Sequence, residues 1–195
     1  MNHLIISVIT TGRWIDNNWE TIIVSNIGKL IYSDLNFNKG SIIANMIISA
    51  VFNSGLDDYE FVLVDVVSKE IPHASALFTP GIIYIKPGSS WEALIHELGH
   101  AYRDKTVGPI YNYCVMRDTD GNRISFDEAA EAMYQEEVKA TEWANEQAEK
   151  YGGYKICKIS PKKLKTFMIK QLKDLQRYNF TTANEVIDYF VSLTG

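Results

Sequence analysis

The chain has 195 residues, of which 46% are hydrophobic and 22% charged, and its net charge is −5. These values are typical of one compact domain spanning residues 1–195, and they argue against a disordered chain. The negative charge argues against nucleic acid or an anionic membrane as a partner. No apolar run approaches the roughly 20 residues of a membrane span, and the N-terminus lacks the basic region of a signal peptide. We therefore expect a cytoplasmic protein, with secretion as an effector left open and no oligomeric state predicted.

The first half of the chain, residues 1–88, is predicted to be rich in strands. The Ile/Val-rich run 3–10 predicts a strand, and the run 20–32 predicts a hairpin with a short turn at Asn26-Ile27-Gly28. Apolar residues at helical spacing predict a helix over 39–53, which Gly55 would end. The apolar run 60–67 fits an inner strand, and a further strand is predicted at 82–86. Prolines flank this last strand, which favours a place at the sheet edge.

The second half, residues 89–195, is predicted to be helical. Ser89 or Ser90 can cap a helix that starts near Trp91, and residues 105–123 are expected to form a loop. Ser125 with Glu128 matches a capping box at the start of a long helix. Two more helices are expected, from Pro161 to about Tyr178 and from Thr181 or Thr182 to about Leu193. A sheet-rich half followed by helices predicts an α+β fold.

The helix that starts near Trp91 carries the sequence His96-Glu97-Leu98-Gly99-His100, an HExxH motif. Residues four apart on a helix lie one above the other, so His96 and His100 can direct their imidazoles at one metal ion. Glu97 projects about 100° around the helix, where it can take a proton from a water on that metal. Two of the four histidines lie in this one turn, which favours a zinc site over a helix with two incidental histidines.

A catalytic zinc ion usually has three protein ligands and one water. The metzincin pattern is excluded because Arg103 and Thr106 stand where it needs glycine and histidine. The long downstream helix offers eight carboxylates: Asp127, Glu128, Glu131, Glu136, Glu137, Glu142, Glu146 and Glu149. Glu137 is favoured, because its neighbours at helical spacing are small or apolar and a buried glutamate needs a partner. Glu136 has similar neighbours and stays an alternative on pattern alone.

These motifs together resemble the gluzincins, the zinc metallopeptidases that combine HExxH with a glutamate ligand. The segment Glu137-Val-Lys-Ala-Thr-Glu-Trp-Ala144 resembles the E-x-x-A-x-x-[FW]-A helix of ImmA/IrrE-type peptidases, and Glu136-Glu137 resembles the small NleD-like effector peptidases. The resemblance covers about residues 80–149. It departs from the ImmA/IrrE pattern at Thr141, where asparagine is usual, and no helix-turn-helix segment accompanies it.

The resemblance implies a zincin-like fold and Glu137 as the third ligand. It also implies that an extended peptide binds along the strand 81–86, and that the reaction is peptide hydrolysis. We therefore predict a metallopeptidase with one zinc ion per chain on His96, His100 and Glu137, Glu97 as general base, and a protein or peptide substrate. The alternative is a non-catalytic zinc-binding interaction protein of the phage, plasmid or effector type.

Such a peptidase also needs a group that stabilises the oxyanion. The sequence leaves six candidates for this role: His73, Tyr102, Tyr111, Tyr113, Tyr151 and Tyr154. The two cysteines, Cys114 and Cys157, form no CxxC pair and are expected to be free thiols.

Overall fold

A computed structural model describes residues 4–6, 42–65, 67, 75–86, 89–152 and 160–194. Its elements, in chain order, are β1 (Leu4–Ile6), α3 (Ile42–Asn53), β2 (Glu60–Leu63), β3 (Ala76–Thr79), β4 (Ile82–Ile85), α4 (Trp91–Val107), the 3-10 helix η2 (Ile110–Val115), α5 (Phe126–Gly152), α6 (Pro161–Gln176) and α7 (Ala183–Ser192). The predicted α+β class is confirmed. Of the predicted strand at 3–10 only β1 is described, and the predicted hairpin at 20–32 lies outside the described residues.

The four strands form one mixed sheet in the order β1-β2-β4-β3. β1 pairs antiparallel with β2, β2 pairs parallel with β4, and β3 pairs antiparallel with β4. β2 is an inner strand, as predicted. The prediction that residues 81–86 form the sheet edge is wrong, because β4 lies between β2 and β3; among the described strands, the two edges are β1 and β3.

The flanking prolines do not place β4 at the edge because neither of them lies within the strand. Pro80 belongs to the turn that joins β3 to β4, and Pro87 comes after the last residue of β4. Every residue of β4 therefore keeps the backbone N–H that a two-sided strand requires. The turn itself depends on Gly81, whose φ of 83° is open to glycine and strained for other residues.

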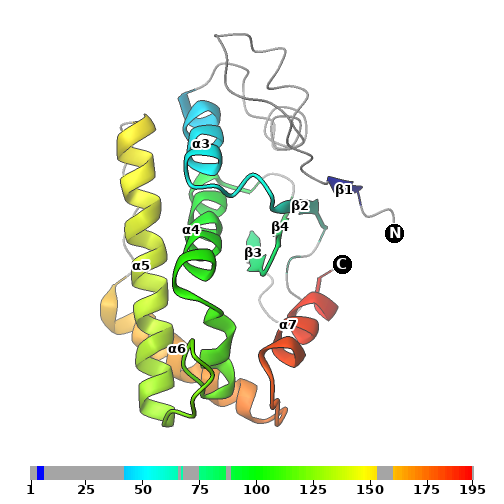
Figure 1. Cartoon of the computed structure of the whole chain (residues 1–195), viewed down its shortest axis with the longest axis vertical. Coiled ribbons are helices and arrows are strands. Elements are labelled where there is room, and N and C mark those ends of the chain that lie inside the picture. The colour runs from blue at the N-terminus through cyan, green and yellow to red at the C-terminus, as the bar shows by residue number, and fades with distance from the viewer. Residues whose placement is uncertain are drawn as a thin grey trace.

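Helix α4 lies between the sheet and α5, and α4 and α5 run side by side in opposite directions (Figure 1). The main core fills the space between the sheet and the helices α3, α4 and α5; its fully buried members include Met46, Ile47, Phe61, Ile83, Ile85, Leu94, Ile95 and Leu98. A second, smaller core joins the N-terminal end of α5 to α6. The HExxH sequence therefore lies on a helix that is packed on two sides.

The helix starts agree with their predicted capping residues. Ser90 accepts a hydrogen bond from the N–H of Ala93, and Ser125 and Glu128 form the reciprocal bonds of a capping box. A second capping box joins Thr182 and Glu185. Within the ranges that the structure describes, no helix is both long and apolar enough to cross a membrane.

The loop predicted at 105–123 is partly wrong. Helix α4 continues to Val107, and its C-terminal cap is Gly108, with φ of 116°. The 3-10 helix η2 then begins at Ile110, whose N–H donates to the carboxylate of Asp104 at 3.1 Å. Gly108 and Pro109 therefore end α4 later than predicted, and Asp104 fixes the start of the next turn.

Candidate metal centre

The geometry of the site begins with a close contact between α4 and α5. A Cβ atom on Gly99 would lie 2.5 Å from the carbonyl oxygen of Ala140, closer than real Cβ contacts allow. Only glycine therefore fits at this point of α4. The two helices are antiparallel here, and Glu137 lies one turn before Ala140. The contact therefore places Glu137 opposite His96, which precedes Gly99, and His100, which follows it.

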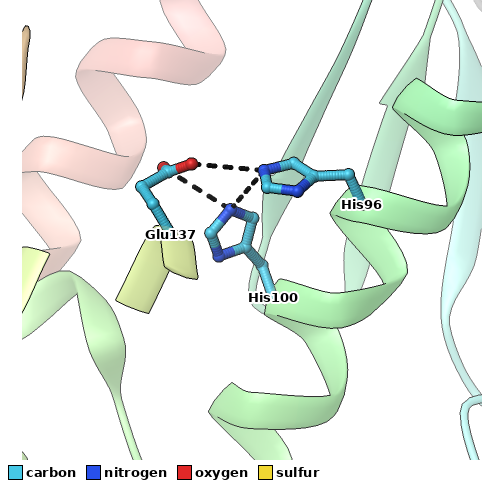
Figure 2. A group of neighbouring side chains, drawn as sticks. All are labelled: His96, His100 and Glu137. Carbon is cyan, nitrogen blue, oxygen red and sulfur yellow. Dashed lines mark hydrogen bonds and ion pairs between the residues drawn. The ribbon is translucent and has the colours of Figure 1, made fainter. Parts of the chain in front are cut away.

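The three side chains point toward one another from two helices (Figure 2). The Nε2 atoms of His96 and His100 are 3.1 Å apart. One carboxylate oxygen of Glu137 lies 3.2 Å from Nε2 of His96, and the other lies 3.5 Å from Nε2 of His100. The three residues proposed as ligands from the sequence are thus brought to one place.

These distances can be compared with those around a metal ion. In a tetrahedral zinc site with bonds of about 2.0–2.1 Å, neighbouring ligand atoms are roughly 3.3 Å apart. The three measured separations, 3.1, 3.2 and 3.5 Å, lie on both sides of that value. The His96, His100 and Glu137 group could therefore hold a metal ion.

Each imidazole is oriented by a second contact on its other nitrogen. Nδ1 of His96 lies 3.3 Å from the hydroxyl oxygen of Thr141, and Nδ1 of His100 lies 3.4 Å from Oε1 of Glu136. An Nδ1–H that donates to either partner leaves Nε2 without a proton and able to bind a metal ion. Oε2 of Glu136 in turn accepts a hydrogen bond of 2.6 Å from Nε of Arg103.

The two neighbouring glutamates therefore differ in role and in burial. The side chain of Glu136 is 7% exposed and that of Glu137 is 27% exposed. Glu136, the alternative ligand, is thus the more deeply buried of the two, so burial alone would have favoured it. Glu136 tolerates burial because Arg103 balances its charge, whereas Glu137 faces the two Nε2 atoms.

The charges around His100 favour a cation at this point. Burial lowers the pKa of His100, but Glu137, Glu136 and Glu97 raise it more, to about 9. Burial raises the pKa of Glu137, but His100 and His96 lower it more, so that the carboxyl group keeps its charge. The carboxylates therefore stabilise a positive charge on the His100 imidazole, and a divalent cation at the Nε2 atoms would meet the same field.

Glu97 points to the sheet edge. Its Oε2 accepts a hydrogen bond of 2.8 Å from the backbone N–H of Phe78 on β3. The ring of Phe78 stacks on that of His100, with 6.4 Å between their centres. Glu97 is thus held beside the two histidines by a hydrogen bond from the strand that borders them.

His96, His100, Glu137 and Glu97 open into a cavity of about 240 Å³. Its remaining lining is mostly apolar and comes from the sheet edge, η2, α5, α6 and α7; it includes Leu77, Ile110, Tyr111, Met133, Met168 and Phe190. Cys114 also lines it as a free thiol, and burial raises the pKa of that thiol to about 12, so it stays neutral. Cys157 lies outside the described residues.

Only some of the six predicted oxyanion stabilisers are near this cavity. Tyr111 and Tyr113 line it. Tyr102 instead stacks on Trp143, with ring centres 5.3 Å apart, and Tyr151 packs against the main core. Trp143 belongs to that core and does not line the cavity. His73 and Tyr154 lie outside the described residues.

Three features of the site were missed from the sequence. Arg103 served only to exclude one peptidase subclass, although its place three residues after His100 puts it on the same helix face. Thr141 was noted only as a departure from a pattern, and Phe78 was not considered.

Comparisons with protein-family models, curated proteins and solved structures find no match for the chain.

Proposed function

We propose that the chain is a zinc-dependent metallopeptidase. The observation that carries this proposal is the position of Glu97, which lines the same cavity as His96, His100 and Glu137 without belonging to the metal-binding group. Two imidazoles and one carboxylate form a donor set typical of catalytic zinc, with one position left for water. Binding zinc alone would not require a carboxylate at Glu97.

When bound, zinc lowers the pKa of a water molecule to about 7 and polarises a carbonyl group. Glu97 accepts a proton from the attacking water as the water oxygen bonds to the carbonyl carbon. The C–N bond then breaks, and Glu97 returns that proton to the leaving amine nitrogen. Thr141 and Glu136 hold the two imidazoles in the tautomer that this reaction requires.

A peptide is the favoured substrate because the cavity borders an edge strand. In the part of the chain that the structure describes, β3 pairs on one side only, with β4. The backbone N–H of Phe78 points away from β4 toward Glu97, so this edge of the strand faces the site. An extended peptide could add to it as a further strand and place an apolar side chain in the cavity. Together with the resemblance to gluzincins, this arrangement supports a zincin-like fold.

The first test is the zinc content of the purified protein. We expect about one zinc ion per chain, as in other catalytic zinc sites. Glu137→Ala should lose it, whereas Glu146→Ala, an exposed glutamate on the same helix, should keep it. A wild-type chain that takes up no zinc after reconstitution would overturn the proposal.

The second test separates an enzyme from a zinc-binding protein without activity. Glu97→Gln should keep its zinc and cleave a synthetic peptide library at least about 100-fold more slowly than wild type, because the general base is lost. A wild-type chain that binds zinc and cleaves no peptide would instead favour the non-catalytic alternative.

A further inference from the structure

The proposed reaction requires a donor that stabilises the oxygen of the reacting carbonyl group. Among the described residues, two tyrosines of η2, Tyr111 and Tyr113, reach the cavity. Their surroundings differ, and the difference points to one of them. The inference below rests on the proposed peptidase function and deepens it.

Tyr111 and Glu97 meet at the same residue of the edge strand. The hydroxyl of Tyr111 donates a hydrogen bond to the backbone carbonyl of Phe78, and the N–H of Phe78 donates to Glu97 at 2.8 Å. The N–H and the C=O of Phe78 both point away from β4. They do so because Phe78 and Ile83 form a pair that is not hydrogen-bonded in the β3–β4 ladder. The chain's own side chains therefore occupy the positions that a substrate strand would use.

Tyr113 faces a different part of the site. Burial raises the pKa of Tyr113, Glu136 raises it further, and Arg103 lowers it. The charged neighbours of Tyr113 are thus Glu136 and Arg103, which lie on the Nδ1 side of His100. For Tyr111, burial raises the pKa well above its usual range, and Cys114 and Glu97 raise it further, so its hydroxyl keeps the proton that a donor needs.

The ring of Tyr111 is held on two sides. Its centre lies 6.1 Å from the ring of Phe78 and 6.1 Å from the ring of Phe190 on α7. The start of η2 is fixed in turn by the bond from the N–H of Ile110 to Asp104. The hydroxyl can therefore change its acceptor by a small rotation while the ring stays in place.

We propose that Tyr111 is a catalytic residue with two acceptors. In the free protein its hydroxyl binds the carbonyl of Phe78, which caps the edge strand. When a peptide adds to β3, the peptide N–H takes over that carbonyl, and the Tyr111 hydroxyl donates to the oxygen of the reacting carbonyl group. No proton is lost from Tyr111 in this exchange, so the proton balance of the reaction rests on Glu97 alone.

The test is Tyr111→Phe, which removes one oxygen, with Tyr102→Phe as the matched control, because Tyr102 stacks on Trp143 and does not line the cavity. On a peptide that wild type cleaves, kcat of Tyr111→Phe should fall about 100-fold, as when one oxyanion donor is removed. KM should be unchanged or lower, because the Phe78 carbonyl is then free to pair with the substrate. Tyr102→Phe should keep both constants.

A second readout does not depend on turnover. A peptide with a phosphinic group in place of the scissile bond imitates the tetrahedral species, and its affinity should fall by the same factor as kcat/KM. The affinity of the ordinary peptide, measured in the Glu97→Gln background, should not fall. Zinc content and the free energy of unfolding check that the variant is folded.

The outcomes separate this inference from the proposed function. An active wild type with an equally fast Tyr111→Phe, or a rise in KM alone, would overturn the role of Tyr111 and leave the peptidase intact. A zinc-bound wild type without activity would overturn both. If Tyr111→Phe does not fold, difluorotyrosine at this position keeps the hydroxyl and makes it more acidic. The more acidic hydroxyl is a stronger hydrogen-bond donor, so kcat at neutral pH should exceed that of wild type, and an unchanged kcat would contradict the proposal.

Discussion

Helix α5 packs against α4 and against α6 in two different ways. Against α4 the closest approach is at Gly99 and Ala140, where the helix backbones come together without a side chain between them. Against α6 the contact is made by longer apolar side chains, among them Met133, Leu164, Met168 and Leu172. The first interface holds the metal-binding group, and the second lies toward the N-terminal end of α5.

The difference shows which interface determines the geometry of the site. Long side chains such as methionine can adapt to small shifts, so a packing of this kind tolerates change in the helix positions. A backbone contact has no such freedom, and an added methyl group must move a whole helix. We therefore expect zinc affinity to depend on the α4–α5 contact and to be nearly independent of the α5–α6 contact.

The largest effect is expected from Gly99→Ala. Its Cβ would lie 2.5 Å from the Ala140 oxygen, so α5 must move away and carry Glu137 with it. A displacement of about 1 Å at such a site can cost about 100-fold, and we expect a loss of zinc affinity of that order. The free energy of unfolding of the metal-free protein should fall by about 1–3 kcal/mol, as for overpacking.

A double variant checks the cause of this loss. The atoms that crowd the new methyl group are backbone atoms of Ala140, so Gly99→Ala combined with Ala140→Gly should not recover zinc affinity. Recovery by Ala140→Gly would show that side chains, and not backbones, determine the distance between the helices. Zinc affinity is measured by competition with a chelator of known affinity.

The next effect is expected from Glu136→Gln. This change removes the charge between Nδ1 of His100 and Arg103 and should weaken zinc binding about 10–100-fold, as for other residues that orient a metal ligand. Glu146→Gln on the same helix is the control and should bind zinc as wild type does. An unchanged affinity in Glu136→Gln would mean that the helix contact alone orients His100.

A smaller effect is expected from Thr141→Val. The variant keeps the shape of the side chain and removes the hydroxyl that lies 3.3 Å from Nδ1 of His96. Because the lost bond involves a neutral acceptor, the loss of zinc affinity should be near the lower limit for such residues, about 10-fold. Thr141→Ser should restore most of it, and a serine variant as weak as the valine variant would contradict this role.

The smallest effect on zinc binding is expected from Leu172→Ala in the α5–α6 core. Leu172 is fully buried, so the free energy of unfolding should fall by about 2–5 kcal/mol. Zinc affinity of the folded protein should nevertheless stay within about twofold of wild type, because this interface adapts to change. A loss as large as that of Gly99→Ala would show that both interfaces determine the site.

Several features of this protein follow from its sequence alone, because they depend on residues near one another in the chain. His96 and His100 share a helix face through their spacing, and Ser90 and Ser125 begin helices because their side chains accept hydrogen bonds from the first turn. Gly81 and Gly108 adopt positive φ where the chain turns or a helix ends. These are local effects of stereochemistry and hydrogen bonding.

Other features were decided only by tertiary structure. Glu136 and Glu137 are both flanked by small apolar residues, and the contact of Gly99 with Ala140 sets which of them faces the two Nε2 atoms. The edge position of β3 depends on which strands pair across the chain, and local proline placement did not reveal it. Tyr111 and Tyr113 are distinguished by their neighbours in space: the hydroxyl of Tyr111 meets the Phe78 carbonyl, and Tyr113 lies near Glu136 and Arg103. Each of these outcomes depends on contacts between residues distant in sequence, whose relative positions no local pattern encodes.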